Sequence, residues 1–198
     1  MHFNPSKHTL ALAAACSTLV LAGCSPDTSS DKSDAKQAAF LNRSQAVTAQ
    51  FQSELQTTLS TAIGDKGAVG AIGVCQSAAP AIAQALSDES GLSISRIARR
   101  NRNADGGLSP ELEPLYAQLE AGPMDDGAPR KVHGSVDGAL VYLQAIPMKE
   151  QPCSVCHGTN IDPTISDAIA AAYPDDLATG FEPGELRGAF LVQDQAQP

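Results

Sequence analysis

The spacing of apolar residues divides the chain into a short leader and a longer region of helices and strands. Apolar residues between positions 38 and 63 recur at intervals of three, four or six, which predicts a long helix that ends near Gly64. Residues 92–97 alternate between apolar and polar, as a half-buried strand does. Residues 131–146 hold two strand-like runs around an Asp-Gly pair, a strong signal for a hairpin turn.

Shorter runs complete the expected fold. Residues 68–74 predict a buried strand or an extended lead-in, and residues 189–192 predict a closing strand. Short helices are expected over residues 79–86, 110–120 and 164–172. Helices interleaved with short strands and one hairpin predict a single α+β domain with an antiparallel sheet.

The first apolar run indicates an export signal. Lys7 precedes an apolar stretch over residues 10–21, which is shorter than the roughly 20 residues that span a bilayer. The stretch ends in Leu21-Ala22-Gly23-Cys24, which matches a bacterial lipobox. In that pattern a peptidase cuts before the cysteine, whose thiol carries a diacylglycerol. We therefore predict a lipoprotein signal peptide over residues 1–23 and lipidation of Cys24; the alternative is an ordinary signal peptide followed by a chance cysteine.

The mature chain is expected to begin with a polar tether. Residues 24–37 are rich in Ser, Asp and Lys and cannot bury apolar surface, so we expect them to be flexible. Residues 38–198 then form one domain. Ser25 stands where an Asp would signal inner-membrane retention in enteric-type sorting. We expect a protein on the periplasmic side that is lipid-anchored to a membrane, with the outer membrane favoured.

Charge narrows the classes of partner. The chain has 22 acidic and 13 basic residues and a formal net charge of −9. This balance argues against nucleic acid and against anionic membrane surfaces as partners. A basic redox partner protein is compatible with it, and the membrane is reached through the lipid anchor alone.

Cysteine usage points to a cofactor. The chain has five cysteines, of which Cys16 leaves with the signal and Cys24 is the predicted lipid site. The remaining three, Cys75, Cys153 and Cys156, are an awkward number for a disulfide framework in an exported protein. The number is natural if two thiols become thioethers and the third binds a metal.

The segment Cys153-Ser154-Val155-Cys156-His157 is the attachment signature of a c-type haem. Two thiols add to the two haem vinyl groups, and His157 is then placed beneath the iron. We expect the segment to lie in a loop after Pro152 and to hold one covalent haem c. Half of a zinc site is one alternative, but no second ligand pair is present. A thioredoxin-like pair is another, but it needs a βαβ context.

The sixth iron ligand stays open on residue types alone. Cys75 is unpaired beside a predicted helix start, where the helix dipole favours a thiolate. His133 lies in a strand-like run, where a lone histidine is usually structural. Met148 is close in sequence to Cys153, and Met124 sits in a loop rich in Gly, Pro and Asp.

The chain resembles a bacterial family of single-haem c domains with a PAS-like fold, long catalogued as a domain of unknown function. Arg100 and Asn101 depart from its pattern, because they stand where the family shows Asn-Pro. The segments that carry the resemblance are Ala71-Ile72-Gly73-Val74-Cys75 with Ala79-Pro80, Arg99 and Asn103, Cys153 to Gly158, Tyr173-Pro174 with Asp176, Ala178-Thr179-Gly180 and Gly184-Glu185-Leu186-Arg187-Gly188-Ala189.

The resemblance implies a PAS-like antiparallel sheet flanked by helices, with a long N-terminal helix, and iron held by His157 and Cys75. Such iron has no open position, and a thiolate ligand implies a low reduction potential. Arg99 and Arg187 are candidates for pairing with the haem propionates, with solvated surface arginines as the alternative. We expect periplasmic electron transfer without enzymatic activity. The alternative is a redox or diatomic-gas sensor that signals to a separate protein.

Overall fold

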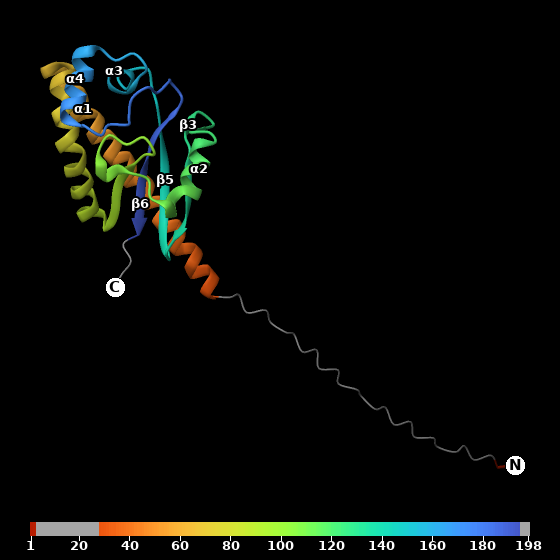
Figure 1. Ribbon diagram of the computed structural model, residues 1–198. Helices are drawn as coiled ribbons and strands as arrows, with labels where there is room; N and C mark the ends of the chain where they lie inside the picture. Colours follow the sequence, from red (N-terminus) through yellow and green to blue (C-terminus); the bar gives the residue numbers. More distant parts are fainter. Residues whose placement is uncertain (3–27, 195–198) are drawn as a thin grey trace.

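A computed structural model describes residues 1–2 and 28–194, so Cys24 and nearly all of the predicted signal peptide lie outside the described residues. Its centre is a four-stranded antiparallel sheet in the order β1-β6-β5-β4 (Figure 1). The strands are β1 (Leu92–Ile97), β4 (Lys131–Val136), β5 (Ala139–Pro147) and β6 (Leu186–Asp194). A separate two-stranded hairpin pairs β2 (Met124–Asp125) with β3 (Ala128–Pro129).

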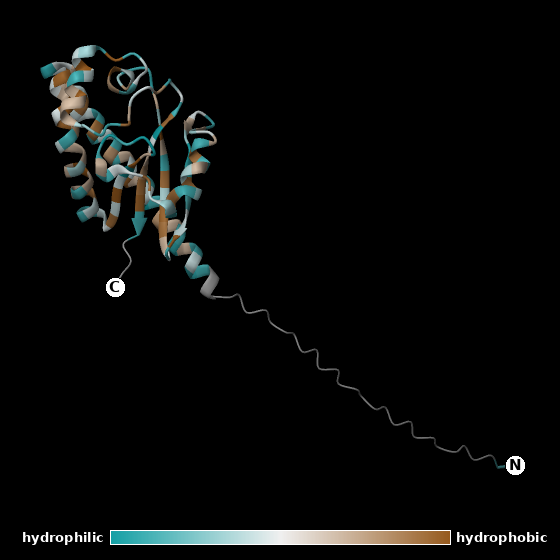
Figure 2. Ribbon diagram, in the orientation of Figure 1, coloured by the Kyte–Doolittle hydropathy of each residue, from teal (hydrophilic) through white to brown (hydrophobic). Residues whose placement is uncertain are grey.

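The two central strands are buried on both faces. β5 and β6 have five consecutive buried residues each, whereas the edge strand β4 alternates between exposed and half-buried positions. Apolar residues accordingly concentrate along the central strands in Figure 2. β6 corrects one expectation: the predicted closing strand over residues 189–192 is longer, and it lies between β1 and β5 in the interior of the sheet.

The long helix α1 (Thr28–Ser90) consists of two arms joined at Gly67, whose backbone is not helical (φ 68°, ψ 177°). Figure 1 shows the orange first arm running along the sheet and the yellow to green second arm turning back. By length and apolar composition α1 also resembles a membrane span. Residues of both arms nevertheless pack in one core with the sheet, where the Phe51 and Phe190 rings meet edge to face at 5.4 Å.

The opposite face of the sheet is covered by α2 (Glu113–Glu120) and the 3-10 turn η2 (Pro110–Leu112) that precedes it. Leu119 is completely buried there against Val141 and Leu143 of β5. A second 3-10 turn, η1 (Ala104–Gly106), and two more helices, α3 (Ser154–His157) and α4 (Pro163–Ala172), complete the chain. The antiparallel sheet flanked by helices, with its long N-terminal helix, confirms the predicted α+β fold class.

Two local expectations are wrong. Residues 68–74 are helical, because the second arm starts directly after Gly67 and buries Ala71 and Ile72. The expected tether is helical from Thr28 onward, since exposed polar turns extend a helix that packing already stabilises further along. Strand 92–97, the hairpin over 131–146 and the helices over 110–120 and 164–172 are confirmed, apart from small shifts at their ends.

The break in α1 predicts opposite effects for two glycine substitutions in open surroundings. A Cβ at Gly67 or at Gly64 would meet nothing within 4 Å, so any effect comes from the backbone alone. Gly67→Ala forces a side chain into a conformation reserved for glycine and should cost about 1–3 kcal/mol of unfolding free energy. Gly64→Ala, in helical backbone, should instead add about 0.5–1 kcal/mol. Urea unfolding of both variants measures this; equal effects would contradict a strained break at Gly67.

Candidate functional site

The segment Cys153 to His157 carries the predicted attachment signature, and this attachment turn is one turn of helix rather than an irregular loop. Cys153 precedes α3, and its carbonyl accepts from the backbone N–H of His157 at 3.0 Å and of Cys156 at 3.3 Å. Residues three and four positions apart share a helix face, so the two thiols and the imidazole point to the same side. The turn ends at Gly158, whose N–H donates to the Ser154 carbonyl at 3.0 Å.

The ring of His157 is fixed by one short hydrogen bond. Its Nδ1 lies 2.6 Å from the Ala178 carbonyl oxygen. A carbonyl can only accept, so the proton is on Nδ1 and the lone pair is on Nε2. Arg187 Nε lies 3.1 Å from the same Nδ1. Because a protonated Nδ1 cannot accept a hydrogen bond, this is a contact between the ring and a positive charge. Burial and then the charges of Arg187 and Arg102 hold the pKa of His157 well below its usual value. The imidazole is therefore neutral, with Nε2 free to bind a metal.

A buried ion pair joins this turn to the loop after α4. Arg102 Nε and Nη2 donate to the two carboxylate oxygens of Asp176 at 3.1 and 3.0 Å. The side chains are 12% and 8% exposed, so this is a buried pair rather than a surface one. The same Nη2 donates to the Cys156 carbonyl at 2.7 Å and to the Ala178 carbonyl at 3.3 Å. Asp176 Oδ1 in turn accepts from the Ala178 N–H at 2.9 Å.

Backbone hydrogen bonds also join the attachment turn to the loop after α4. Phe181 N–H donates to the His157 carbonyl and Gly180 N–H to the Gly158 carbonyl, both at 2.9 Å. Arg100 donates to the Thr179 carbonyl, and its guanidinium lies 3.8 Å from the centre of the Phe181 ring. Arg100, which departs from the pattern of the family resemblance, thus binds the loop that carries Ala178.

Cys75 lies in the second arm of α1, about two turns beyond Gly67. The expectation that a helix starts beside it is therefore wrong, and the helix dipole gives no reason for a thiolate there. Burial raises the pKa of the Cys75 thiol, while Arg96 and Arg102 lower it. Burial is the main cause that raises the pKa of Cys156. Arg102 lowers this pKa, and a negative charge on Cys75 raises it further. The thiol of Cys75 and the attachment turn therefore share one electrostatic neighbourhood.

Positive charge exceeds negative charge around this site. Arg102 is paired with Asp176, but among the described residues neither Arg96 nor Arg187 has a carboxylate within ion-pair distance. Burial, together with Arg96 and Arg102, lowers the pKa of Arg187 to about 9, which still leaves it charged at neutral pH. Two arginines that lack a carboxylate partner within the described part of the chain lie near a neutral imidazole and a thiol, and they favour a ligand that carries negative groups.

The structure places the other predicted site residues elsewhere. Arg99 donates to both Glu113 and Glu120 at 2.8–3.1 Å, and its side chain is half exposed. The Arg99 guanidinium is thus already paired with two carboxylates, unlike that of Arg187. His133 lies on β4 with its Nδ1 3.3 Å from Gln37 of the first arm of α1.

The two candidate methionines differ in burial. Met124 is exposed in β2, and Met148 is buried in a small cluster with Ala178 and Phe181, against which Cys153 packs. Neither Arg96 nor Arg102 was among the site residues predicted from the sequence. Arg96 lies within β1 and Arg102 shortly after it, and a basic residue at either position carries no local signal of the partners that it will meet. A backbone carbonyl carries no such signal at all.

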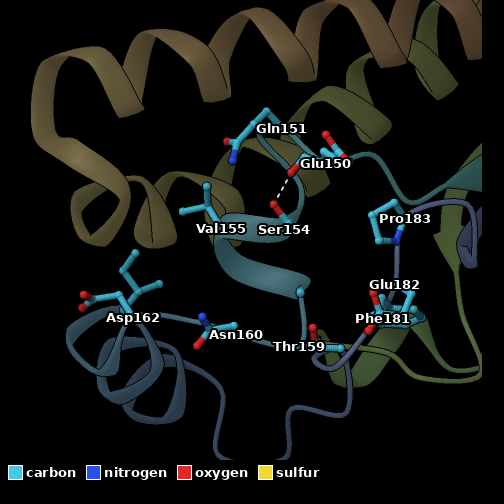
Figure 3. Close-up of a pocket in the computed structure, with 12 residues that line it drawn as sticks. Glu150, Gln151, Ser154, Val155, Thr159, Asn160, Asp162, Phe181, Glu182 and Pro183 are labelled. Carbon is cyan, nitrogen blue, oxygen red and sulfur yellow. Dashed lines mark hydrogen bonds between the residues drawn. The ribbon is translucent and has the colours of Figure 1, made fainter.

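A groove of about 550 Å³ lies beside the attachment turn (Figure 3). Ser154 and Val155 of the turn line it, whereas neither the two thiols nor His157 does. The groove therefore belongs to the other face of the turn. Its lining combines acidic and apolar side chains, among them Glu150 and Phe181.

Comparison with known proteins agrees with this architecture. The model of the Tll0287-like family matches residues 27–193. The chain is also similar to a solved structure described as the crystal structure of the cyanobacterial heme-protein Tll0287, with a TM-score of 0.62 and 20% sequence identity. That similarity covers 80% of this chain and 96% of the other, and at this identity it establishes a shared fold. No curated protein matches the chain.

The tight end of the attachment turn predicts a sensitive glycine. A Cβ at Gly158 would lie 2.7 Å from the Ser154 carbonyl oxygen, so the turn must open to accept it. Gly158→Ala should cost about 1–3 kcal/mol of unfolding free energy. Gly107→Ala is the matched control, because its backbone is also extended and its Cβ would lie 3.9 Å from the nearest atom. We expect that control to be neutral or stabilising by about 0.4–1 kcal/mol. Thermal unfolding that ranks the two variants the other way would show that the turn is looser than described.

Proposed function

We propose a function from the premise that the chain belongs to the Tll0287-like family. The protein is an exported lipoprotein that binds one covalent haem c and transfers electrons at low potential on the periplasmic side. One observation carries the proposal: a single helical turn presents two thiols and a neutral imidazole on one face, with the imidazole fixed through Nδ1 so that Nε2 is free.

The residues present fit a haem. Cys153 and Cys156 would form the two thioethers, and His157 would bind the iron through Nε2. Arg187 and Arg96 have no carboxylate partner among the described residues, and their two charges match the two haem propionates. We therefore assign the pairing with the propionates to these two arginines in place of Arg99, which two glutamates already bind. When bound, the haem supplies reversible one-electron chemistry.

Cys75 is the proposed second iron ligand. Its support is the electrostatic neighbourhood that it shares with Cys156, Arg96 and Arg102. A thiolate favours ferric iron and so a low potential, and two protein ligands leave no position for substrate. This supports an electron carrier without enzymatic activity.

Sensing is the second candidate, and one observation favours it. Burial raises the pKa of Cys75, so the thiol would take up a proton readily once its bond to iron is lost. A redox change or a diatomic ligand would then switch the protein by releasing Cys75, and a separate protein would receive the signal.

The lipobox at Cys24 supports attachment to a membrane by lipid, with the outer membrane favoured by Ser25. The acidic balance of the chain supports a basic protein as redox partner, and it disfavours nucleic acid.

The first test is the mass of the mature protein, produced with the haem-attachment machinery and the lipoprotein-processing enzymes present. We expect the mass of one porphyrin on the wild type and a c-type pyridine haemochrome. Cys153→Ala with Cys156→Ala should lose both, because no thioether can form. A wild-type protein without porphyrin mass would refute the proposed function. In the same spectra, Cys24→Ser should remove the lipid mass and leave the haem in place.

The second test concerns Cys75 as the second proposed iron ligand. Cys75→Ala should abolish the thiolate-type low-spin signal in the electron paramagnetic resonance spectrum of the ferric protein and make the iron accessible to cyanide. The covalent haem should remain. His133→Ala is the control, because His133 contacts Gln37 outside the site, and its spectrum should equal that of the wild type. An unchanged spectrum for Cys75→Ala would exclude Cys75 as the ligand.

A further inference from the structure

The ion pair of Arg102 and Asp176 takes no part in the proposed haem ligation, yet it contacts both sides of the bond that fixes His157. On one side, Arg102 Nη2 donates to the carbonyl of Cys156, the residue directly before His157, at 2.7 Å. On the other side, the same nitrogen lies 3.3 Å from the Ala178 carbonyl that accepts from His157. One guanidinium thus bridges the donor segment and the acceptor segment.

Asp176 completes the arrangement from within the loop. Its Oδ1 accepts from Ala178 N–H at 2.9 Å and from Arg102 Nε at 3.1 Å. This carboxylate therefore orients the backbone at Ala178 and holds Arg102 in the position from which it reaches Cys156. The pair is buried, so water cannot replace these bonds at low cost when one partner is removed.

We propose that Arg102 and Asp176 are positioning residues that set the strength of the His157–Ala178 hydrogen bond and, through it, the reduction potential of the iron. The inference rests on the proposed function. A short Nδ1–H···O=C bond makes an imidazole a more basic ligand, which favours ferric iron. Loosening this bond weakens the donation and raises the potential.

If Arg102 and Asp176 acted on the iron only through their charges, the two single variants would shift the reduction potential in opposite directions. Asp176→Asn leaves an unpaired positive charge near the iron, which also raises the potential. Arg102→Gln leaves an unpaired negative charge, which by charge alone lowers it. The double variant Arg102→Gln/Asp176→Asn keeps the local net charge and removes only the geometry of the pair. It therefore separates positioning from electrostatics.

The experiment is an optical redox titration of haem-loaded wild type, both single variants and the double variant. We expect the double variant to shift the ratio of reduced to oxidised haem at a fixed electrode potential about tenfold towards reduced, which corresponds to roughly 59 mV for one electron. The g-values of the ferric electron paramagnetic resonance signal should change with it, because the imidazole is no longer held in one orientation. Glu120→Gln removes a carboxylate from Arg99 on the surface and should change neither readout.

A folded double variant with wild-type potential and g-values would overturn the inference and leave the haem proposal intact. If the double variant does not fold, Arg102→Lys decides, because lysine keeps the charge but lacks the planar fork that reaches Asp176 and Cys156 together. Its potential should rise with altered g-values, and an unchanged spectrum would equally overturn the inference. A wild type without covalent haem would instead refute the proposed function, and the inference with it.

Discussion

The bond from His157 Nδ1 to the Ala178 carbonyl joins two segments that are 21 residues apart and decides what the attachment turn can do. It puts the ring proton on Nδ1, so that the free lone pair is on Nε2. Without an acceptor at this position, the imidazole could rotate or take either tautomer. A neutral, oriented imidazole is the property on which the site depends, and burial together with neighbouring arginines keeps it neutral.

The sheet brings these partners together. Arg96 lies on β1 and Arg187 near the start of β6, two strands that pair directly. β6 comes very close to β1 at Gly188, where a Cβ would lie 2.8 Å from the Ile97 carbonyl oxygen. The chain that leaves β1 then carries Arg100 and Arg102 onto the loop after α4. Pairing at one end of two strands thus supplies most of the positive charge of the site.

The reversal of α1 at Gly67 has a comparable role for Cys75. A straight helix of this length would carry residue 75 away from the sheet. The break allows the second arm to turn back and pack against β1, which brings Cys75 into the electrostatic neighbourhood of Cys156. The three free thiols and the neighbouring arginines lie outside the two larger apolar cores, which occupy the two faces of the sheet.

Local patterns in the sequence determined the features that depend on neighbouring residues. These include the alternation of β1, the hairpin of β4 and β5, and the spacing that places Cys153, Cys156 and His157 on one face. Tertiary structure alone decided the helical state of residues 68–74, the central position of β6, and the pairing of Arg99 with two glutamates. The reason is physical. Periodicity records which side of an element is apolar, whereas the partners of a buried charge or of a ring nitrogen are set by chain reversals and by backbone carbonyls, which every residue has and no side chain marks.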